Sequence, residues 1–172
     1  EQVVLLPILG INTAIISIIA QNYGAKNFNR IKETYITAIK YAFIIMVISG
    51  IIVFISANII TSVFSNDPEV IEYGKRYLKI SAFVLPAYPV FFLSNGFFMA
   101  LKKSENAMIS NFFRNVLNPI IVFYIAKYIS ASFNTFFWIW VGINWFFSIL
   151  YFLIVIYYFK NKLDKSGAVI HP

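Results

Sequence analysis

The chain has 172 residues, of which 60% are hydrophobic and only 12% are charged, and its mean hydropathy is +0.76. Soluble domains carry about a quarter of charged residues, so this composition excludes an ordinary globular surface and indicates a membrane protein. The net charge of +7 would suggest a nucleic-acid partner for a soluble protein. Here the basic residues gather in short links between apolar runs, which favours a positive-inside bias and argues against nucleic acid.

The residues that carry most enzyme chemistry are absent or isolated. There is no cysteine, which excludes disulfides and thiolate metal sites, and the single His171 is one residue from the end of the chain, where a solvated tail is the simpler interpretation. No carboxylate pair falls within an apolar run, and no Walker sequence or glycine-rich phosphate loop occurs. We therefore expect no enzyme activity, no bound cofactor and no metal site.

Five apolar intervals are each long enough to cross about 30 Å of hydrocarbon at about 1.5 Å per residue. They are apolar most of the way round, whereas the helices of a soluble all-α domain would show one polar face. We therefore predict an all-α, polytopic membrane protein with five transmembrane helices. The predicted spans are residues 3–20, 41–64, 80–101, 106–129 and 133–159.

The first span contains Pro7, which removes one backbone hydrogen bond and favours a kink. A stripe of small and polar residues recurs along it at helical spacing, either as a packing face for another helix or as part of a cavity lining. This stripe consists of Gly10, Thr13, Ser17 and Gln21. We expect Gly24 to end the helix in a left-handed C-cap, and residues 25–40 to form an amphipathic helix at the membrane interface.

The second span, 41–64, is rich in Ile and Val and is predicted to be a scaffold helix. The polar residues that follow break it. Ser65, Asn66 or Asp67 is expected to cap a new helix, with Pro68 in its first turn. That helix is expected to continue into the third span.

The third span carries Pro86 and Pro89 near its middle. A broken helix at membrane depth is tolerated only where protein or a water-filled cavity satisfies the freed carbonyls. Ser81, Tyr88 and Asn95 are seven residues apart, so a continuous helix would place them on one face. Cavity lining and interhelical packing are both open interpretations of these three side chains.

The fourth span contains Arg114, the only charged residue within the apolar segments. We favour the interpretation that its long side chain snorkels to the nearby interface. The alternative is a buried arginine bonded to helix-end carbonyls, either fixing the fold or facing a cavity. Asn118 lies one turn further along the same span. The fifth span is strongly aromatic, which suits an interfacial belt, and carries a minor polar stripe of Asn144, Ser148 and Tyr151.

The basic residues predict the orientation. Alternate links hold eight of them, and the opposite links hold four. The first set is Lys26, Arg30, Lys32, Lys102, Lys103, Lys160, Lys162 and Lys165; the second is Lys75, Arg76, Lys79 and Lys127. The side with eight is expected to be cytoplasmic, so the C-terminus would also be cytoplasmic.

Three motifs carry a resemblance to a known family. Residues 20–30 read AQNYGAKNFNR, which is similar to the Q-N-x-G-A-x-N-x-x-R signature of the multidrug and toxic compound extrusion (MATE) transporters. Residues 64–71 (FSNDPEVI) and 95–103 (NGFFMALKK) follow in the order and approximate spacing of the second half of such a transporter. The resemblance extends from about residue 7 to residue 162.

The resemblance implies that residues 1–162 form most of a six-helix C-terminal lobe, that 163–172 are a cytoplasmic tail, and that an N-terminal lobe is missing. It also implies secondary active efflux of organic, often cationic, compounds or drugs across the cell membrane, in exchange for sodium ions or protons. The candidate residues for the substrate cavity are Thr13, Ser17, Gln21, Ser81, Tyr88, Asn95, Arg114 and Asn118.

Ion coupling normally requires a carboxylate within the membrane, because ion binding must change the local charge. Some members of the MATE family carry one in the helix that corresponds to the third span, where this chain has Tyr88 and Asn95. All acidic residues here fall in links or termini. Either the coupling-ion site lies in the missing N-terminal half, or this protein departs from the family pattern.

Two other hypotheses remain at the level of the sequence. A lipid-linked oligosaccharide flippase of the same broad fold would need a more cationic cavity for phosphate, and Arg114 is the one residue that hints at it. A membrane scaffold or fragment without transport activity is favoured by the missing start and by the missing intramembrane carboxylate.

Overall fold

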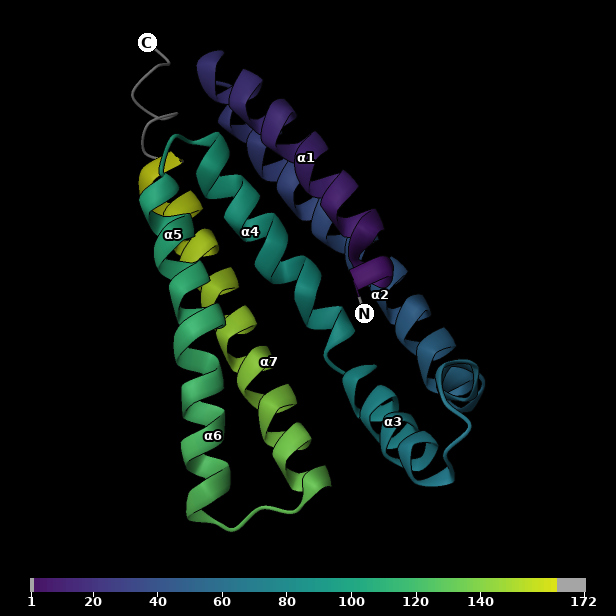
Figure 1. The fold of residues 1–172 in the computed structure, drawn as a ribbon. Helices are drawn as coiled ribbons and strands as arrows, with labels where there is room; N and C mark the ends of the chain where they lie inside the picture. The colour runs from purple at the N-terminus through teal and green to yellow at the C-terminus, as the bar shows by residue number, and fades with distance from the viewer. Residues whose placement is uncertain (1, 164–172) are drawn as a thin grey trace.

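Five helical segments of membrane-spanning length make up the fold in the computed structural model, which describes residues 2–163 (Figure 1). Over these residues the prediction of an all-α, polytopic fold with five spans is confirmed, and no strand occurs. The helices are α1 (Gln2–Gly24), α2 (Phe28–Phe64), α3 (Pro68–Ser81), α4 (Tyr88–Ala100), α5 (Ser104–Phe112), α6 (Asn118–Tyr128) and α7 (Phe133–Tyr158). A 3₁₀ turn, Leu85–Ala87, joins α3 to α4, and π-helical turns occupy Phe113–Leu117 and Phe159–Leu163.

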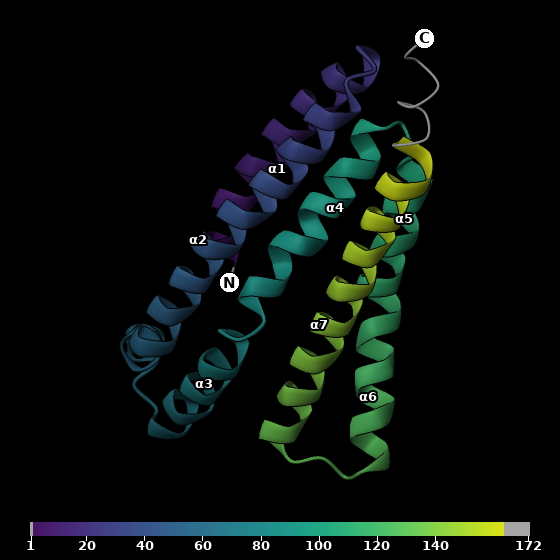
Figure 2. The same ribbon diagram turned by 180° about the vertical axis from the view of Figure 1, so that it is seen from behind.

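The third span forms the centre of the bundle. Helix α4 lies between the α1–α2 pair on one side and the helices α5, α6 and α7 on the other (Figure 1, Figure 2). In the segment Pro68–Ala100, 72% of the most apolar window is buried, compared with 11–28% in the other four spans. The other helices expose long rows of Ile, Val and Phe, which suits contact with lipid.

Helix α2 begins earlier than predicted. Residues 28–40 are not a separate interfacial helix but the first turns of α2, so that prediction is wrong. Asn27 caps this end, accepting a hydrogen bond from the Arg30 N–H at 3.2 Å. Ile31 and Tyr35 are fully buried against the aromatic end of α4, and this apolar stripe continues into the membrane span without a break. Packing along the whole stripe therefore keeps the helix continuous.

The Tyr35 side chain ties α2 to α4 inside this core. The Ser94 hydroxyl donates to the Val90 carbonyl at 2.6 Å, so the 2.7 Å hydrogen bond between Tyr35 and Ser94 must be donated by the tyrosine. The Tyr35 ring also packs on Phe97, with 5.3 Å between ring centroids. Both polar groups are therefore satisfied without water, as burial in lipid requires.

The turn after α1 also differs from expectation. Gly24 remains helical, and no glycine in the described part of the chain has a positive φ; instead Lys26 adopts φ 57°. The Asn27 N–H bonds to the Asn22 carbonyl at 2.9 Å and the Lys26 N–H to the Tyr23 carbonyl at 3.1 Å. This pair of bonds is a Schellman motif with Lys26 in the left-handed position.

The polar link after α2 behaves as predicted. Asp67 accepts a hydrogen bond from the Glu69 N–H at 2.9 Å and so caps α3, and Pro68 occupies the first turn. Helix α3 exposes Glu72, which pairs with Arg76 at 2.9 Å and with Lys75 at 3.8 Å. Helix α3 therefore places charged side chains directly before the apolar part of the central span.

The central span is broken between Ser81 and Tyr88. Because prolines have no N–H, Pro86 and Pro89 cannot continue the helical ladder, and the chain makes turns instead. The Phe83 carbonyl freed by this break accepts a 2.9 Å hydrogen bond from the indole N–H of Trp145 on α7. Gly50 of α2 lies directly against the break, because a Cβ added there would be 2.9 Å from the Ala82 carbonyl oxygen.

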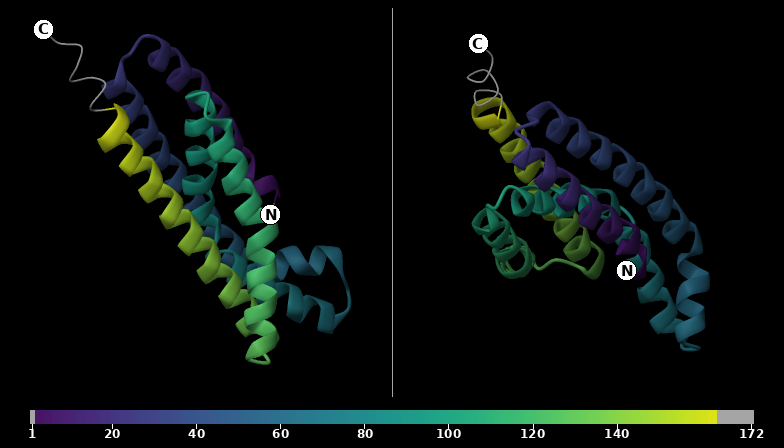
Figure 3. Two further views of the ribbon diagram at one scale, coloured as in Figure 1. Left: turned by 90° about the vertical axis from the view of Figure 1, so that its left-hand side faces the viewer. Right: turned by 90° about the horizontal axis from the view of Figure 1, so that it is seen from above.

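The links alternate between two ends of the bundle (Figure 3). The α1–α2 and α4–α5 links and the end of α7 lie at one end, and the α2–α3 and α6–α7 links lie at the other (Figure 1). The described residues of the two basic sets, which exclude Lys165, therefore do lie at opposite ends, while the side of the membrane that each end faces stays a prediction. Apart from Leu163, the tail expected over 163–172 lies outside the described residues, as does His171.

We expect the α6–α7 end to face the outside of the cell. Because the sequence lacks cysteine, single serine-to-cysteine changes give matched probes: Ser104→Cys at the first residue of α5, next to the α4–α5 link, and Ser130→Cys in the α6–α7 link, both exposed. A membrane-impermeant maleimide should label Ser130→Cys in intact cells and Ser104→Cys only after permeabilisation. The reverse pattern would invert the topology, and the unsubstituted protein is the control.

Gly50→Ala should destabilise the fold by about 1–3 kcal/mol, because the added methyl group meets backbone rather than a movable side chain. Gly142→Ala on α7 is the matched control, since nothing lies within 4 Å of its Cβ position and the change should be neutral or stabilising. Thermal unfolding in detergent compares the two variants. Equal unfolding temperatures would contradict the close approach of α2 to the break.

Candidate substrate site around Arg114

Arg114 lies within a π-helical turn of the fourth span. The Asn118 N–H bonds to the Phe113 carbonyl, five residues back, rather than to the residue four back. The missing N–H of Pro119 disrupts the ladder at this point, and a π turn absorbs the irregularity. The extra residue in the turn directs the Arg114 side chain toward the central helix α4.

The Arg114 guanidinium packs on three aromatic rings at the start of α4. Its central carbon lies 4.8 Å from the ring centre of Tyr88, 4.5 Å from that of Phe91 and 5.0 Å from that of Phe92. These distances are in the range of cation–π attraction, which is strongest where water is excluded. We call these four residues the Arg114 cluster.

The snorkelling interpretation of Arg114 is wrong. A snorkelling side chain would extend toward the nearby α4–α5 link, but the guanidinium lies against the start of α4, at the opposite end of that helix. The three rings hold the charge near the middle of the central span. A permanently charged guanidinium at this depth is a strong local source of positive potential.

A cavity of about 260 Å³ adjoins the cluster between α4, α5, the π turn and α7. Its lining combines Arg114 and Phe91 with the hydroxyl-bearing residues Ser110 and Tyr151. The Tyr151 hydroxyl donates to Asn95 Oδ1 at 3.3 Å, and the Asn95 amide donates to the Phe91 carbonyl at 3.2 Å. Asn95 and Tyr151 therefore form a buried polar contact between α4 and α7 beside the cavity.

Asn118 is buried, with 2% of its surface exposed, one turn beyond Arg114. Its Oδ1 atom has no hydrogen-bond partner among the described residues. A buried acceptor without a partner is costly in a folded protein and calls for an explanation such as a ligand or another part of the protein.

The other predicted site residues lie elsewhere. Thr13, Ser17 and Gln21 are exposed on α1, and their hydrogen bonds are local to that helix. The stripe therefore faces away from the described bundle and does not pack within it. Ser81 is buried at the end of α3 and donates to the Leu78 carbonyl at 3.1 Å. Because the break follows Ser81, the seven-residue helical register holds only from Tyr88 to Asn95.

The sequence analysis did not single out three residues near the centre of the bundle: Phe91, Phe92 and Asn12. Phe91 and Phe92 look like ordinary core residues until Arg114 is placed on them. Asn12 on α1 lies against Gly96 of α4, and its buried Oδ1 also has no partner among the described residues. Asn12 lies one position before Thr13 and so outside the stripe, and a search for every polar residue in the first span would have found it.

The arrangement is that of a polytopic membrane protein with a broken central helix and, beside the start of α4, a mainly apolar pocket that carries one positive charge. A fixed positive charge attracts anionic groups and repels cations, while the ring faces and the cavity offer apolar contact. Within the described residues no group of His, Cys, Asp or Glu could hold a metal ion.

Comparison with known proteins identifies the family. The MatE family model matches residues 1–125, and the chain therefore belongs to this family of transporters. It is similar in structure to the outward-facing conformation of a multidrug resistance MATE family transporter of the MOP superfamily, with a TM-score of 0.88 and 22% identity, covering 95% of this chain and 36% of that one.

The chain is also similar to two curated proteins that are much longer than it is. The chain is 23% identical over 142 residues to the probable multidrug resistance protein YpnP of Bacillus subtilis, covering 83% of this chain and 29% of that protein. It is 28% identical over 80 residues to an FAD transporter of Shewanella oneidensis, covering 46% of this chain and 18% of that protein. The chain thus spans less than a third of either relative.

Asn118→Leu should raise the unfolding temperature, because it removes a buried acceptor whose isolation costs about 1–3 kcal/mol. Asn144→Leu is the matched control: Asn144 is also buried, but its amide donates to the Trp140 carbonyl at 2.8 Å, so its loss should be destabilising. Thermal unfolding in detergent measures both. Destabilisation by Asn118→Leu equal to that by Asn144→Leu would show that Oδ1 is satisfied.

Proposed function

We propose that this chain is the C-terminal lobe of a secondary active transporter that exports organic compounds from the cell in exchange for sodium ions or protons. The observation that carries the proposal is the fold, which matches MATE transporter structures over 95% of the chain. The broken central helix supports it, since secondary transporters bind their substrates near the membrane midplane beside discontinuous helices.

The coupling site is proposed to lie in an N-terminal lobe of the same protein. All acidic residues in the described range fall in links or near helix ends, so the five spans offer no carboxylate whose charge an ion could change. The polar stripe of Thr13, Ser17 and Gln21, which is exposed on α1, is proposed to line the cavity between the two lobes. The C-terminus is proposed to be cytoplasmic.

A second candidate is a flippase for a phosphate-bearing lipid-linked oligosaccharide. The position of Arg114 favours it, because a guanidinium held at membrane depth suits a phosphate oxygen better than an organic cation. The curated relative named as an FAD transporter also has a phosphate-containing cargo in its name. Both candidates share the fold and differ in the charge of the substrate.

Energised everted vesicles should accumulate a fluorescent organic cation, and accumulation should stop when the sodium or proton gradient is dissipated by an ionophore. Under this leading proposal Arg114→Gln should retain or increase the transport of the cation, because it removes a like charge from the lobe. Lys127→Gln, at an exposed residue of α6, is the control for a general loss of positive charge.

For a phosphate-bearing substrate the expected result is opposite. Arg114→Gln should reduce rescue of a flippase-deficient strain by about tenfold, which corresponds to a lost charged hydrogen bond of about 1.5 kcal/mol. Lys127→Gln should again have no effect. Transport in neither assay by the full-length protein would contradict both candidates and favour a membrane protein without transport activity.

A further inference from the structure

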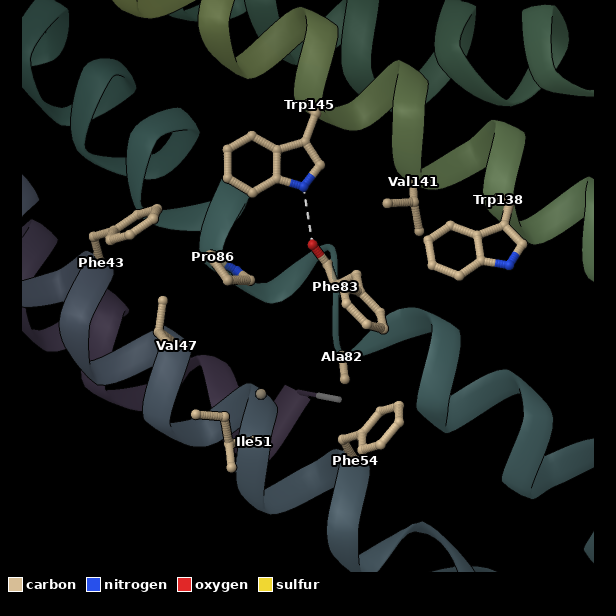
Figure 4. A pocket seen from close by; sticks show the side chains of 11 residues that line it. Phe43, Val47, Ile51, Phe54, Ala82, Phe83, Pro86, Trp138, Val141 and Trp145 are labelled. Carbon is tan, nitrogen blue, oxygen red and sulfur yellow. Dashed lines mark hydrogen bonds between the residues drawn. The ribbon is translucent and has the colours of Figure 1, made fainter.

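A second cavity, of about 540 Å³, lies between α2 and α7 over the break in the central span (Figure 4). It shares no lining residue with the cavity beside Arg114. Its walls are almost wholly aliphatic and aromatic: Val47 and Phe54 on α2, Phe83 and Pro86 at the break, and Trp138 and Trp145 on α7. The volume is typical of a cavity that holds an organic ligand.

The one polar contact drawn in this cavity is already satisfied internally. The Trp145 indole N–H donates to the Phe83 carbonyl at 2.9 Å (Figure 4). The cavity therefore offers apolar contact rather than hydrogen bonds to an occupant. Lined in this way, it suits a flexible hydrocarbon chain better than a polar solute.

One end of the cavity carries a positive charge. The Lys79 ammonium lies 5.2 Å from the ring centre of Phe54, which lines the cavity. Phe54 in turn packs on Phe83 at 5.9 Å and Phe83 on Trp138 at 5.3 Å, so Lys79 stands beside the aromatic end of the cavity.

Lys79 differs from the other basic residues of α3. Lys75 and Arg76 are paired with Glu72, whereas no carboxylate of the described residues lies within ion-pair distance of Lys79. Lys79 also directly precedes the apolar run that begins at Ile80, so we expect its long side chain to extend to the level where lipid headgroups meet the hydrocarbon.

We propose that this cavity binds an anionic phospholipid, with one acyl chain between α2 and α7 and the headgroup phosphate on Lys79. The cavity extends along α2 from Phe54 to Phe43, about 16 Å of helix at about 1.5 Å per residue. This length matches a chain that enters from the interface and reaches the level of the break. A hydrophobic cation would meet the like charge of Lys79, so the charge at the rim selects an anion.

The site acts on the fold rather than on the transported substrate. An acyl chain there would fill the space over the turns between Ser81 and Tyr88, where the central span has its weakest backbone bonding. A bound lipid would therefore add packing to the break in the space that α2 and α7 leave between them. This inference does not depend on the proposed transport activity.

Trp138 and Trp145 provide a built-in reporter, because lipids with brominated acyl chains quench indole fluorescence on contact. The full-length protein is reconstituted in phosphatidylcholine vesicles that contain a small fraction of either brominated phosphatidylglycerol or brominated phosphatidylcholine. Subtraction of the signal of a W138F/W145F variant isolates the two reporters. Brominated phosphatidylglycerol should be favoured over phosphatidylcholine by about fivefold in apparent affinity, as expected for one basic side chain near a membrane surface.

Lys79→Gln should reduce this preference to parity while leaving the quenching by phosphatidylcholine unchanged. Lys127→Gln, at the end of α6 on the same end of the bundle but, unlike Lys79, not placed over a ring that lines the cavity, should keep the preference. Val47→Phe, which fills the cavity, should lower quenching by both lipids.

Equal quenching by the two lipids in the unsubstituted protein would show that the cavity meets only bulk lipid, and this result would overturn the proposal. No quenching by either would show that protein covers the cavity, which also overturns it.

Discussion

The structure depends on one constraint: hydrocarbon cannot hydrogen-bond to a peptide group, so every backbone donor and acceptor at membrane depth needs a partner within the protein. Four of the five spans remain helical throughout, with Pro7 accommodated inside α1 and a π turn next to Pro119 in the fourth span. The central span cannot, because Pro86 and Pro89 lack an N–H. The bundle answers with a side chain, the Trp145 indole, which supplies the donor that the Phe83 carbonyl would otherwise lack.

This requirement explains why the third span is the central one. A broken helix exposed to lipid would leave its turns without partners, whereas one surrounded by α1, α2 and α7 can be satisfied from several sides. Both cavities follow from the same break. The turns leave space over α2 and α7, and the new helix start at Tyr88 presents its rings to Arg114. The irregular backbone is therefore the source of the features that could bind ligands.

Local chemistry made part of this arrangement predictable from sequence. The prolines mark the break, Asp67 and Pro68 mark the start of α3, and uncharged runs mark the spans, because each signal acts within a few residues.

The contacts that complete the site could not be predicted in the same way. Trp145 is 62 residues from Phe83, and the direction of Arg114 depends on a π turn that sequence periodicity does not reveal. The extent of α2 was missed because charges on one face of residues 28–40 suggested an interface, while burial of Ile31 and Tyr35 on the other decided the outcome.

The basic residues at the helix ends have two physical roles: some of them stabilise helix ends, and the others set the difference in charge between the two ends of the bundle. Lys26, Lys102 and Ser130 all adopt positive φ in Schellman-type turns, a conformation that costs a side-chain-bearing residue about 1–2 kcal/mol relative to glycine. Lys26 and Lys102 directly follow the last turn of a helix, where the helix dipole favours a positive charge and so offsets part of that cost. The Ser130 end obtains the same benefit from Lys127 in the last turn of α6. One lysine at each of these three ends is therefore accounted for by helix capping. The excess of basic residues at the α1–α2 and α4–α5 end persists after these and the ion-paired residues are set aside. Lys32, Lys103 and Lys160 remain at that end, whereas at the other end Lys75 and Arg76 pair with Glu72 and Lys79 alone remains among the described residues. The charge asymmetry thus rests on residues that the fold does not require, which is the pattern expected when orientation in the membrane is what they serve.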